Sequence, residues 1–413
     1  EMTSSLVGSE MCIRDRHKKH QQNEIKERGR GKMIKAEKVK ISQLALILLI
    51  VIPGGKYLSL PSYMYSISGR DSWLSFLLLF VLDFVCFLFT LWAINLNRRG
   101  LSLNEILTQT LSPVGSKIIF AVFTVFFLLR VTVLLLGCVD LFSSTFVINT
   151  NWLAYIIPIA LLVAVSLVQG VRNVARLTEM LFVFVMLALL SIIFLSLRSA
   201  DFSNLRPFLD EGFKPVLEGS LDGSFWFADS VFLLFFLEKV EAPKKKDNVL
   251  LCVMLLIGIL VTMALVVLYV ALFGNASGIN GIAITKVSQF NISNNSYGRL
   301  DWLSISIWMC SIFIKIIVLS FCAYSAIVWT VGYKKEKFNW WVFLSMVVPV
   351  IALPLFFEME TFIFNQVSKG FVKYILIVVQ YVLPICLPFL TKAACAKGCL
   401  LYTSPSPRDS TSS

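Results

Sequence analysis

The stretch "VIPGGKYLSLP", residues 51–61, interrupts an otherwise apolar segment that runs from Ile41 to Ile67. About 20 apolar residues are enough to cross a bilayer as a helix, so this segment is long enough to span one. Its middle nevertheless holds Pro53, two glycines and Lys56. Proline removes a backbone donor and glycine loosens a helix, so backbone groups lose their helical partners at mid-membrane depth. Such backbone survives where it lines a cavity or meets a ligand, which makes this stretch a candidate site.

The composition indicates a polytopic membrane protein. The chain has 413 residues, of which 57% are hydrophobic and 15% charged, and it contains 34 phenylalanines. The net charge of +12 comes from short basic clusters between apolar runs, which is typical of cytoplasmic membrane loops. We therefore expect a lipid bilayer as the partner surface, and no nucleic acid.

No catalytic or metal-binding constellation is evident in the sequence. Both histidines, His17 and His20, lie in the polar N-terminal arm, and the nine cysteines are scattered without metal-ligand spacing. There is no nucleophile–base pattern and no nucleotide-binding glycine loop. We expect no cofactor, no metal and no enzymatic activity.

Apolar runs bounded by charge or turn clusters predict ten membrane spans. They lie at about 41–67, 72–96, 118–142, 152–169, 177–197, 217–239, 248–273, 301–332, 339–356 and 372–390. With the N-terminus placed in the cytoplasm, the inner segments carry seventeen Lys and Arg residues and the outer segments eight. This asymmetry predicts that both termini lie on the cytoplasmic side.

Ten spans divide into two sets of five, helices 1–5 over about 41–197 and helices 6–10 over about 217–390. Because five is odd, the second set enters from the opposite side, and two similar halves would form an inverted repeat. The sixth span contains "GSLDGSFWFADS" (219–230), the other long apolar run that is densely interrupted. The prediction is an all-α polytopic protein with a 5+5 inverted repeat and broken helices 1 and 6. The alternative is that proline and glycine merely kink these helices.

Five ionisable residues fall well inside predicted spans: Lys56, Asp83, Arg130, Asp229 and Lys315. Each would be costly facing lipid, so we expect each to face the bundle interior or water. They sum to +1, and we predict that Lys56 or Lys315 lies within ion-pair distance of Asp83 or Asp229. Structural pairing is the alternative to a ligand or proton role for all five.

Both ends of the chain resemble non-native flanks. "SSLVGSEMCIRDR" (4–16) and "CLLYTSPSPRDS" (399–410) look like translated adaptor or read-through sequence. We expect residues 1–32 to be a non-native flank and disordered arm, 33–392 to be the membrane domain, and 393–413 to be a second flank.

Three segments carry a resemblance to a known family: "NLRPFLDEGFKPVLEGSLDGSFWFADSVFLLFFLEKVEAPKKK" (204–246), "ISQLALILLIVIPGGKYLSLP" (41–61) and "ARLTEMLFVFVM" (175–186). They resemble the integral-membrane B subunit of bacterial endospore germinant receptors, and the likeness covers roughly residues 33–392. That family belongs to the amino acid–polyamine–organocation permease superfamily, which implies a leucine-transporter-like fold. The family more often has Gly-Glu where this chain has Ala228-Asp229, and an uncharged or small residue where this chain has Lys56.

The resemblance implies a subunit in the spore inner membrane that binds a small germinant, typically an amino acid, and acts with A- and C-type partner subunits. We expect the ligand between the two interruptions. Its carboxylate would meet the first, at Pro53, Gly54, Gly55, Lys56 and Tyr57. Its ammonium would meet carbonyls and the carboxylate of the second, which comprises Ser224, Phe225, Trp226, Phe227, Ala228 and Asp229. The three aromatic residues among these would close over its side chain.

Two other functions stay open at this point. The first is a self-sufficient amino-acid or cation transporter of the same superfamily that uses the same site. The second is an ion channel, which long polar faces would support and which the sequence shows little of.

Overall fold

The computed structural model describes residues 39–97, 100–145, 153–240, 243–278, 300–333, 338–356 and 370–403, together with Val287. These residues belong to one compact unit, Val39–Ser413. The expected N-terminal flank, residues 1–32, lies outside the described residues. The described part of the chain is helical and contains no β-strand, apart from an isolated parallel bridge between Val39 and Val240. The prediction of an all-α protein is confirmed.

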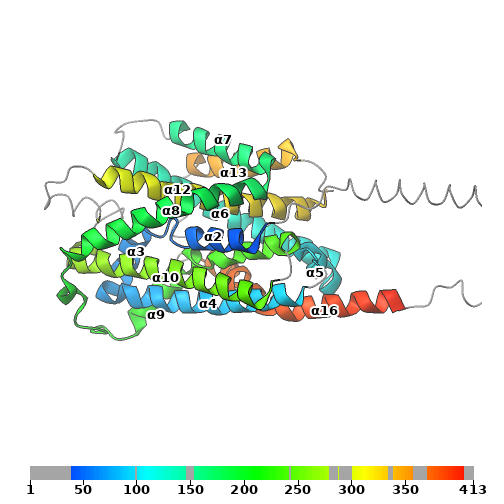
Figure 1. Ribbon diagram of the computed structural model, residues 1–413, viewed down its shortest axis with the longest axis horizontal. Helices are drawn as coiled ribbons and strands as arrows, with labels where there is room; N and C mark the ends of the chain where they lie inside the picture. Colours follow the sequence, from blue (N-terminus) through cyan, green and yellow to red (C-terminus); the bar gives the residue numbers. More distant parts are fainter. Residues whose placement is uncertain are drawn as a thin grey trace, which may run out of the picture. The chain divides into compact units, whose positions relative to one another are not determined.

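The helices follow one another along the chain as in Figure 1. In chain order they are α2 (Ile41–Val51), α3 (Leu60–Ser68), η1 (Gly69–Asp71), α4 (Ser72–Leu96), α5 (Leu103–Thr110), α6 (Pro113–Thr145), α7 (Leu153–Gln169), α8 (Val171–Leu197), η2 (Phe202–Leu205), α9 (Lys214–Gly223), η3 (Ser224–Trp226), η4 (Asp229–Lys239), α10 (Lys245–Phe273), η5 (Gly274–Gly278), α12 (Leu300–Val331), α13 (Trp340–Phe356), α15 (Val372–Ile377), the π-helical η6 (Val378–Val382) and α16 (Leu383–Thr403).

Each of the ten predicted spans overlaps helical residues, although non-helical residues interrupt the first and the sixth. Within the described residues, seven helical stretches are long and apolar enough to cross a membrane, and three shorter apolar helices accompany them. The shorter ones are Ile41–Val51, Leu153–Gln169 and Trp340–Ala352. One long stretch, Leu60–Leu96, joins the end of the first predicted span to the second through η1.

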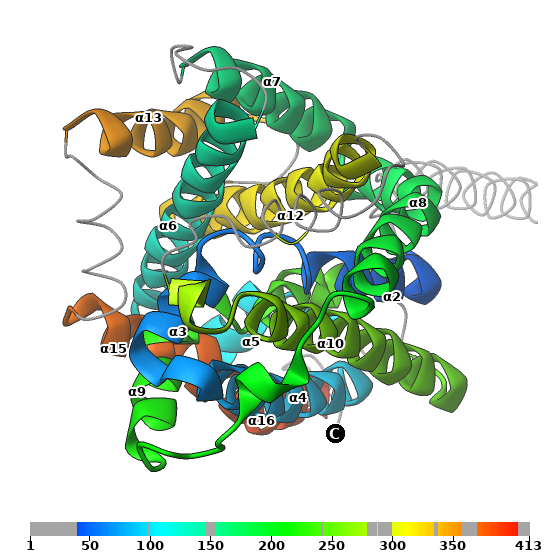
Figure 2. The ribbon, with the colours of Figure 1, turned by 90° about the vertical axis from the view of Figure 1, so that its left-hand side faces the viewer.

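The second part of the segment Lys214–Lys239 lies in the interior of the bundle, since residues 223–237 are all buried. In its most apolar window 89% of the residues are buried, compared with 28% for α8. The helix α2 is also enclosed, since it packs against α8, α10 and α12, and Figure 2 shows it inside the ring of longer helices. The two interrupted segments of the sequence therefore occupy the interior.

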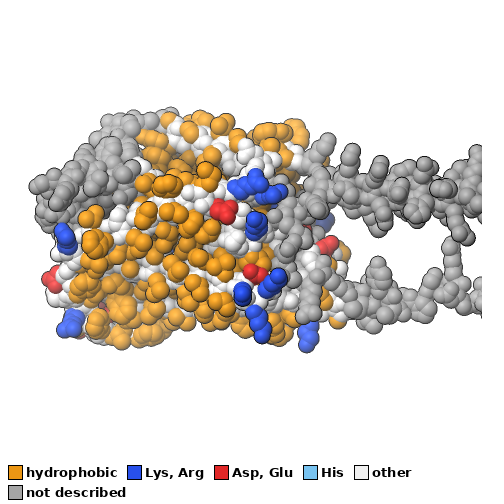
Figure 3. Space-filling view, viewed as in Figure 1, with side chains coloured by type: hydrophobic (Ala, Val, Ile, Leu, Met, Phe, Trp, Pro, Cys, Tyr) orange, Lys and Arg blue, Asp and Glu red, His pale blue; other side chains and the backbone are white. Residues whose placement is uncertain are grey.

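The outward faces of the peripheral helices are apolar. Leu161 of α7, Met180 and Phe194 of α8 and Leu260 of α10 are all exposed. Figure 3 shows hydrophobic side chains over most of this face, with Lys and Arg gathered toward the end near α5 and α16. A contiguous apolar surface of this kind is matched to lipid, and the protein is a multi-pass membrane protein.

The first predicted span consists of two helical pieces. The helix α2 ends at Val51, residues 52–59 form turns and a bend, and α3 begins at Leu60. In the sixth span α9 passes into the short 3₁₀ turn η3, and residues 227–228 are extended or left-handed before η4 begins. The helix η4 is a 3₁₀ run of 11 residues, although such runs rarely exceed a few residues because their hydrogen-bond geometry is poorer.

Candidate functional site

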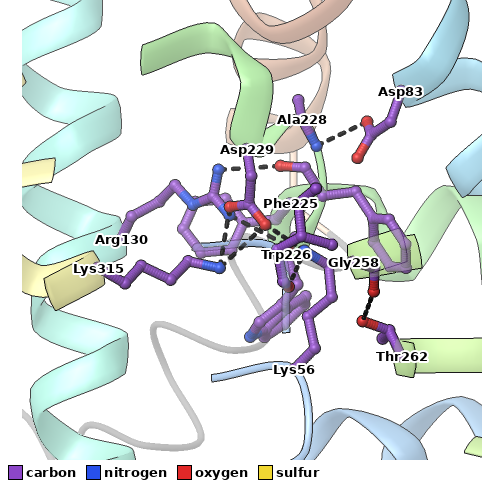
Figure 4. Close-up of polar contacts among 12 residues, drawn as sticks. Lys56, Asp83, Arg130, Phe225, Trp226, Ala228, Asp229, Gly258, Thr262 and Lys315 are labelled. Carbon is purple, nitrogen blue, oxygen red and sulfur yellow. Dashed lines mark hydrogen bonds and ion pairs between the residues drawn. The ribbon is translucent and has the colours of Figure 1, made fainter. Parts of the chain in front are cut away.

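A buried ion cluster joins the two interruptions, and Asp229 is its centre (Figure 4). Lys56 Nζ donates to Asp229 Oδ2, and Arg130 Nη2 lies 2.7 Å from Oδ1. Lys315 Nζ contacts both oxygens, at 2.9 Å from Oδ1 and 3.0 Å from Oδ2. None of these four side chains is more than 5% exposed. One carboxylate thus meets three cations in a buried setting.

The four side chains come from four different segments. Lys56 lies in the turn after α2, and Asp229 is the first residue of η4. Arg130 is in the middle of α6 and Lys315 in the middle of α12, two long helices that pack against each other. Because α6 and α12 are continuous, they hold their two cations at fixed depth beside the interruptions.

Side chains satisfy the backbone carbonyls that the sixth span leaves open. Four consecutive carbonyls, from Ser224 to Phe227, accept hydrogen bonds from other segments. The bonds are Tyr381 Oη to Ser224 O at 3.3 Å, Gln380 Nε2 to Phe225 O at 3.2 Å, Arg130 Nη2 to Trp226 O at 3.0 Å and Arg130 Nη1 to Phe227 O at 2.9 Å. Non-helical backbone inside a membrane protein requires such partners.

The interruption of the sixth span also contains a left-handed residue, Ala228, with φ +57° and ψ +38°. Its N–H donates to Asp83 Oδ1 at 2.7 Å. Residues other than glycine adopt this conformation at a cost of about 1 kcal/mol, so glycine would be less strained here. The left-handed backbone at Ala228 is thus a physical reason to expect glycine at this position, as in the family that the sequence resembles.

In the first interruption, Lys56 makes a similar backbone contact. Its Nζ donates to Ile52 O at 3.0 Å, besides its contact with Asp229. The carbonyl of Pro53 accepts from the Lys56 N–H at 3.3 Å, so the chain turns tightly at this point. Lys56 therefore fixes the turn after α2 and ties it to η4 at the same time.

Close packing shapes the rest of the first interruption. Gly55 has φ +84°, and a Cβ added there would lie 2.4 Å from Leu134 Cδ2 of α6. A Cβ on Gly54 would lie 3.0 Å from the carbonyl oxygen of Ser311 on α12. Gly55 is favoured by its left-handed backbone and by the Leu134 side chain, and Gly54 is confined by the backbone of α12.

Aromatic rings surround the cations. Lys56 Nζ lies 5.0 Å from the ring centroid of Phe227 and 5.7 Å from that of Phe80. The guanidinium of Arg130 lies 5.5 Å from the ring of Phe126 and 6.0 Å from that of Phe225. These distances are within cation–π range, so the rings stabilise buried positive charge. Tyr57 packs against Trp308, with ring centroids 6.1 Å apart.

The structure brings most of the sequence-predicted residues together. Lys56, Arg130, Asp229 and Lys315 form the ion cluster, and the prediction that a central lysine would pair with an aspartate is confirmed. Asp83, predicted in the same charge network, accepts a hydrogen bond from the Ala228 N–H. Whether Pro53–Tyr57 and Ser224–Asp229 bind a ligand stays a prediction.

Sequence reasoning missed Gln380, Tyr381, Phe80 and Trp308. The amide of Gln380 lies in the middle of the apolar run 372–390, and a polar side chain inside a membrane span is itself a functional signal. Gln380 is fully buried, and its Oε1 has no hydrogen-bond partner in the described part of the chain. The aromatic residues carry no such signal, because this chain has many of them in every span.

Among the residues that the structure describes, no group of three or more His, Cys, Asp or Glu is placed to hold a metal ion. The polar atoms at the site are those of Lys, Arg, Asp and Gln side chains and backbone carbonyls. Such a set suits an organic ion with carboxylate or amine groups.

Comparison with known proteins identifies the class to which this fold and site belong. The sequence profile of the spore germination proteins, the spore permease family, matches residues 38–360. The chain belongs to this family, as the sequence resemblance predicted. Spore germination protein XB of Bacillus anthracis is 23% identical over 327 residues, which cover 73% of this chain and 90% of the relative. Spore germination protein YndE of Bacillus subtilis (strain 168) is 24% identical over 218 residues, or 51% of this chain and 58% of the relative.

Proposed function

We propose that the protein is the membrane subunit of a spore germinant receptor, which binds a small germinant, an amino acid, at the ion cluster. One observation carries this proposal: in a chain of the spore germination family, three cationic side chains from three other segments converge on Asp229 between two helix interruptions. Ionisable groups are rare in membrane interiors and mark ligand or ion sites. The site lies in the inner membrane of the spore, with both chain termini on the cytoplasmic side.

The arrangement of the charges supports a 5+5 inverted repeat. The seven long and three shorter apolar helices together account for ten spans. When ten spans are divided into two fives, Lys56 of span 1 corresponds to Asp229 of span 6, and Arg130 of span 3 corresponds to Lys315 of span 8. Interrupted helices at matching places in two halves are the usual position of a transporter-type site. The interruptions at 52–59 and 224–228 are then the broken helices 1 and 6.

The orientation of a zwitterionic ligand follows from which side chains at the site already have polar partners within the described residues. Both oxygens of Asp229 already contact cations, so a ligand ammonium would have to displace one of them. The Oε1 of Gln380 is a buried acceptor without a partner in the described residues, beside the carbonyl of Phe225. Buried acceptors of this kind usually receive a donor, and the ligand amine supplies one. We place the amine near Gln380 and Phe225, and the carboxylate near the cations.

Signalling requires partner subunits. The described residues form helices and short connections, so a change at the cluster reaches other proteins through helix movement. Ligand binding biases a two-state equilibrium of the bundle, which A- and C-type receptor subunits detect. The spore germination function of the two relatives supports this role in germination.

A self-sufficient amino-acid transporter is the second candidate. The enclosed site between two interrupted segments favours it, since transporters bind substrate at this place and then alternate access. Transport and sensing differ in their dependence on partners. A transporter accumulates substrate when it is expressed alone, whereas a receptor subunit requires the other subunits.

Complementation of a deletion strain tests the proposal. Spores that carry this gene with its neighbours, without the neighbours, or with neither are exposed to individual amino acids. The receptor function predicts germination by one or a few amino acids only when the gene and its partners are both present. Uptake of labelled amino acid by the protein alone, together with unchanged germination in the partner deletion, would support the transporter instead.

A further inference from the structure

We infer that Lys56, Arg130 and Lys315 form a carboxylate receptor, and that the carboxylate of Asp229 occupies it until the carboxylate of the germinant displaces it. This inference rests on the proposed function for the identity of the displacing ligand. It assigns the cations, and not Asp229, as the groups that recognise the ligand. It also gives Asp229 the role of a tethered competitor.

The charges of the cluster favour an added anion. Three cations surround one carboxylate, and the second buried carboxylate, Asp83, bonds to the Ala228 N–H. With both aspartates counted, the five buried groups still sum to +1. An uncompensated charge in a low-dielectric interior is costly, so a second anion is stabilised there and an added cation is repelled.

The shape of the cluster fits a planar carboxylate. Lys315 Nζ spans both oxygens of Asp229, while Lys56 and Arg130 each approach one oxygen. A ligand carboxylate offers the same two oxygens at the same spacing and therefore reproduces these bonds. Charge-assisted bonds of this type are shorter and stronger than neutral ones.

The cations differ in how firmly they are held. Lys56 also binds Ile52 O, and Arg130 also binds the carbonyls of Trp226 and Phe227. Within the part of the chain that the structure describes, the polar contacts of Lys315 Nζ are with Asp229 alone. Lys315 is therefore the cation that transfers to a ligand without uncapping any backbone carbonyl.

Asp229 is placed to leave the receptor. It follows the left-handed Ala228 and begins the 3₁₀ helix η4. Rotation at this point moves the carboxylate away without breaking an α-helix. The helix η4 runs from Asp229 to Lys239, so displacement of Asp229 also releases the N-terminal end of η4 from α6 and α12. Binding is thereby coupled to helix movement.

Rescue of a cavity variant by formate tests the inference. Asp229→Gly removes the carboxylate and leaves space for a small anion. We expect the purified full-length variant in detergent to unfold at lower temperature than wild type. Sodium formate is then expected to raise its unfolding midpoint by roughly 3–8 °C in a saturable manner, relative to sodium chloride at equal ionic strength. Wild type, whose receptor is filled, shows no such rise.

Three controls separate charge from space and from general salt effects. Asp229→Asn removes the charge but fills the space, and is expected to be destabilised without rescue by formate. Formamide, which has the shape of formate without its charge, is expected to leave Asp229→Gly unchanged. Asp222→Gly removes a carboxylate whose ion pair within the described residues is with the single cation Lys373, and formate is expected to leave its midpoint unchanged.

If Asp229→Gly does not fold, Asp229→Gly combined with Lys315→Met retains two cations with less excess charge and is expected to bind formate more weakly. A folded Asp229→Gly or double variant whose midpoint is the same in formate and in chloride would overturn the inference. These measurements involve no germination assay. Formate rescue with no germination phenotype would reject the proposed function while keeping the anion receptor, and the reverse result would reject the receptor alone.

Discussion

The two interruptions both contain a left-handed residue, yet they are held in different ways. In the first, Gly55 has φ +84° and lies against Leu134, so the backbone is fixed by close packing. In the sixth, Ala228 has φ +57°, and side chains from other segments bind its N–H and the four preceding carbonyls. The interruption of the first span is therefore sensitive to side-chain size, and that of the sixth span is sensitive to charge and hydrogen bonding.

The largest effect is expected from Asp229→Asn in the sixth interruption. It removes the carboxylate that all three buried cations contact, and breaking a buried ion pair costs about 3–5 kcal/mol of unfolding free energy. We expect a marked loss of protein in the membrane and a lower thermal midpoint after purification. Asp210→Asn, at an exposed position, serves as the control and is expected to match wild type. Equal stability of the two variants would contradict the central place of Asp229.

The next largest effect is expected from Gly55→Ala in the first interruption. A left-handed alanine costs about 1 kcal/mol, and the clash with Leu134 adds about 1–2 kcal/mol, giving roughly 2–3 kcal/mol in total. Thermal unfolding of the purified variant measures the loss. In the double variant Gly55→Ala/Leu134→Ala the clash is absent. Its loss of unfolding free energy is therefore expected to be smaller than the sum of the losses of the two single variants. Strictly additive losses would show that Leu134 does not confine Gly55.

A smaller effect is expected at the N-terminal end of the sixth span, where Asp222 pairs with Lys373 at 2.8 Å. This pair is largely buried, with side chains 8% and 17% exposed, and in the described residues it joins α9 to α15 through one lysine. Removing it with Lys373→Gln is expected to lower the unfolding free energy by about 1–2 kcal/mol, because a single charge-assisted bond is lost. The larger loss of unfolding free energy in Asp229→Asn is attributed to deeper burial and to the number of cations. A loss in Lys373→Gln as large as that in Asp229→Asn would contradict this.

The smallest effect has the opposite sign. Ala228→Gly relieves the left-handed strain, but glycine also gains entropy in the unfolded chain, so a net stabilisation of about 0.5 kcal/mol is expected. Paired with Gly55→Ala, it tests whether both interruptions depend on the same backbone conformation. Destabilisation by Ala228→Gly would mean that the Ala228 methyl packs in a way that outweighs the strain.

The same contrast explains how much was predictable from the sequence. Pro53, Gly54 and Gly55 act through local chain stereochemistry, which a single sequence displays, and apolar run length predicts the helices. Lys56, Arg130, Asp229 and Lys315 were recognisable as a group because charges in apolar runs must find partners in the interior.

Other features depend on tertiary packing and could not be predicted. Nothing local links Arg130 to the carbonyls of Trp226 and Phe227, or Asp83 to the N–H of Ala228 rather than to a cation. The capture of Asp229 by three cations likewise requires the relative positions of α6, α12 and the two interruptions. Sequence reasoning expected Asp229 to meet a ligand ammonium and expected a lysine to pair with one of the two aspartates, whereas the structure shows three cations on Asp229.

Germinant dose–response of spores carrying Lys315→Met tests the central claim most directly, since Lys315 contacts Asp229 without capping backbone in the described residues. The assay uses the amino acid identified by complementation and normalises germination rate to the amount of protein in the spore membrane. Loss of one charge-assisted bond to the ligand, worth about 1.5–3 kcal/mol, predicts a shift to roughly 10- to 150-fold higher germinant concentration. Lys373→Gln, which breaks the ion pair with Asp222, is expected to leave the dose–response curve unshifted. An unshifted curve for Lys315→Met at normal protein level would show that the buried cluster holds the bundle together and does not bind the germinant.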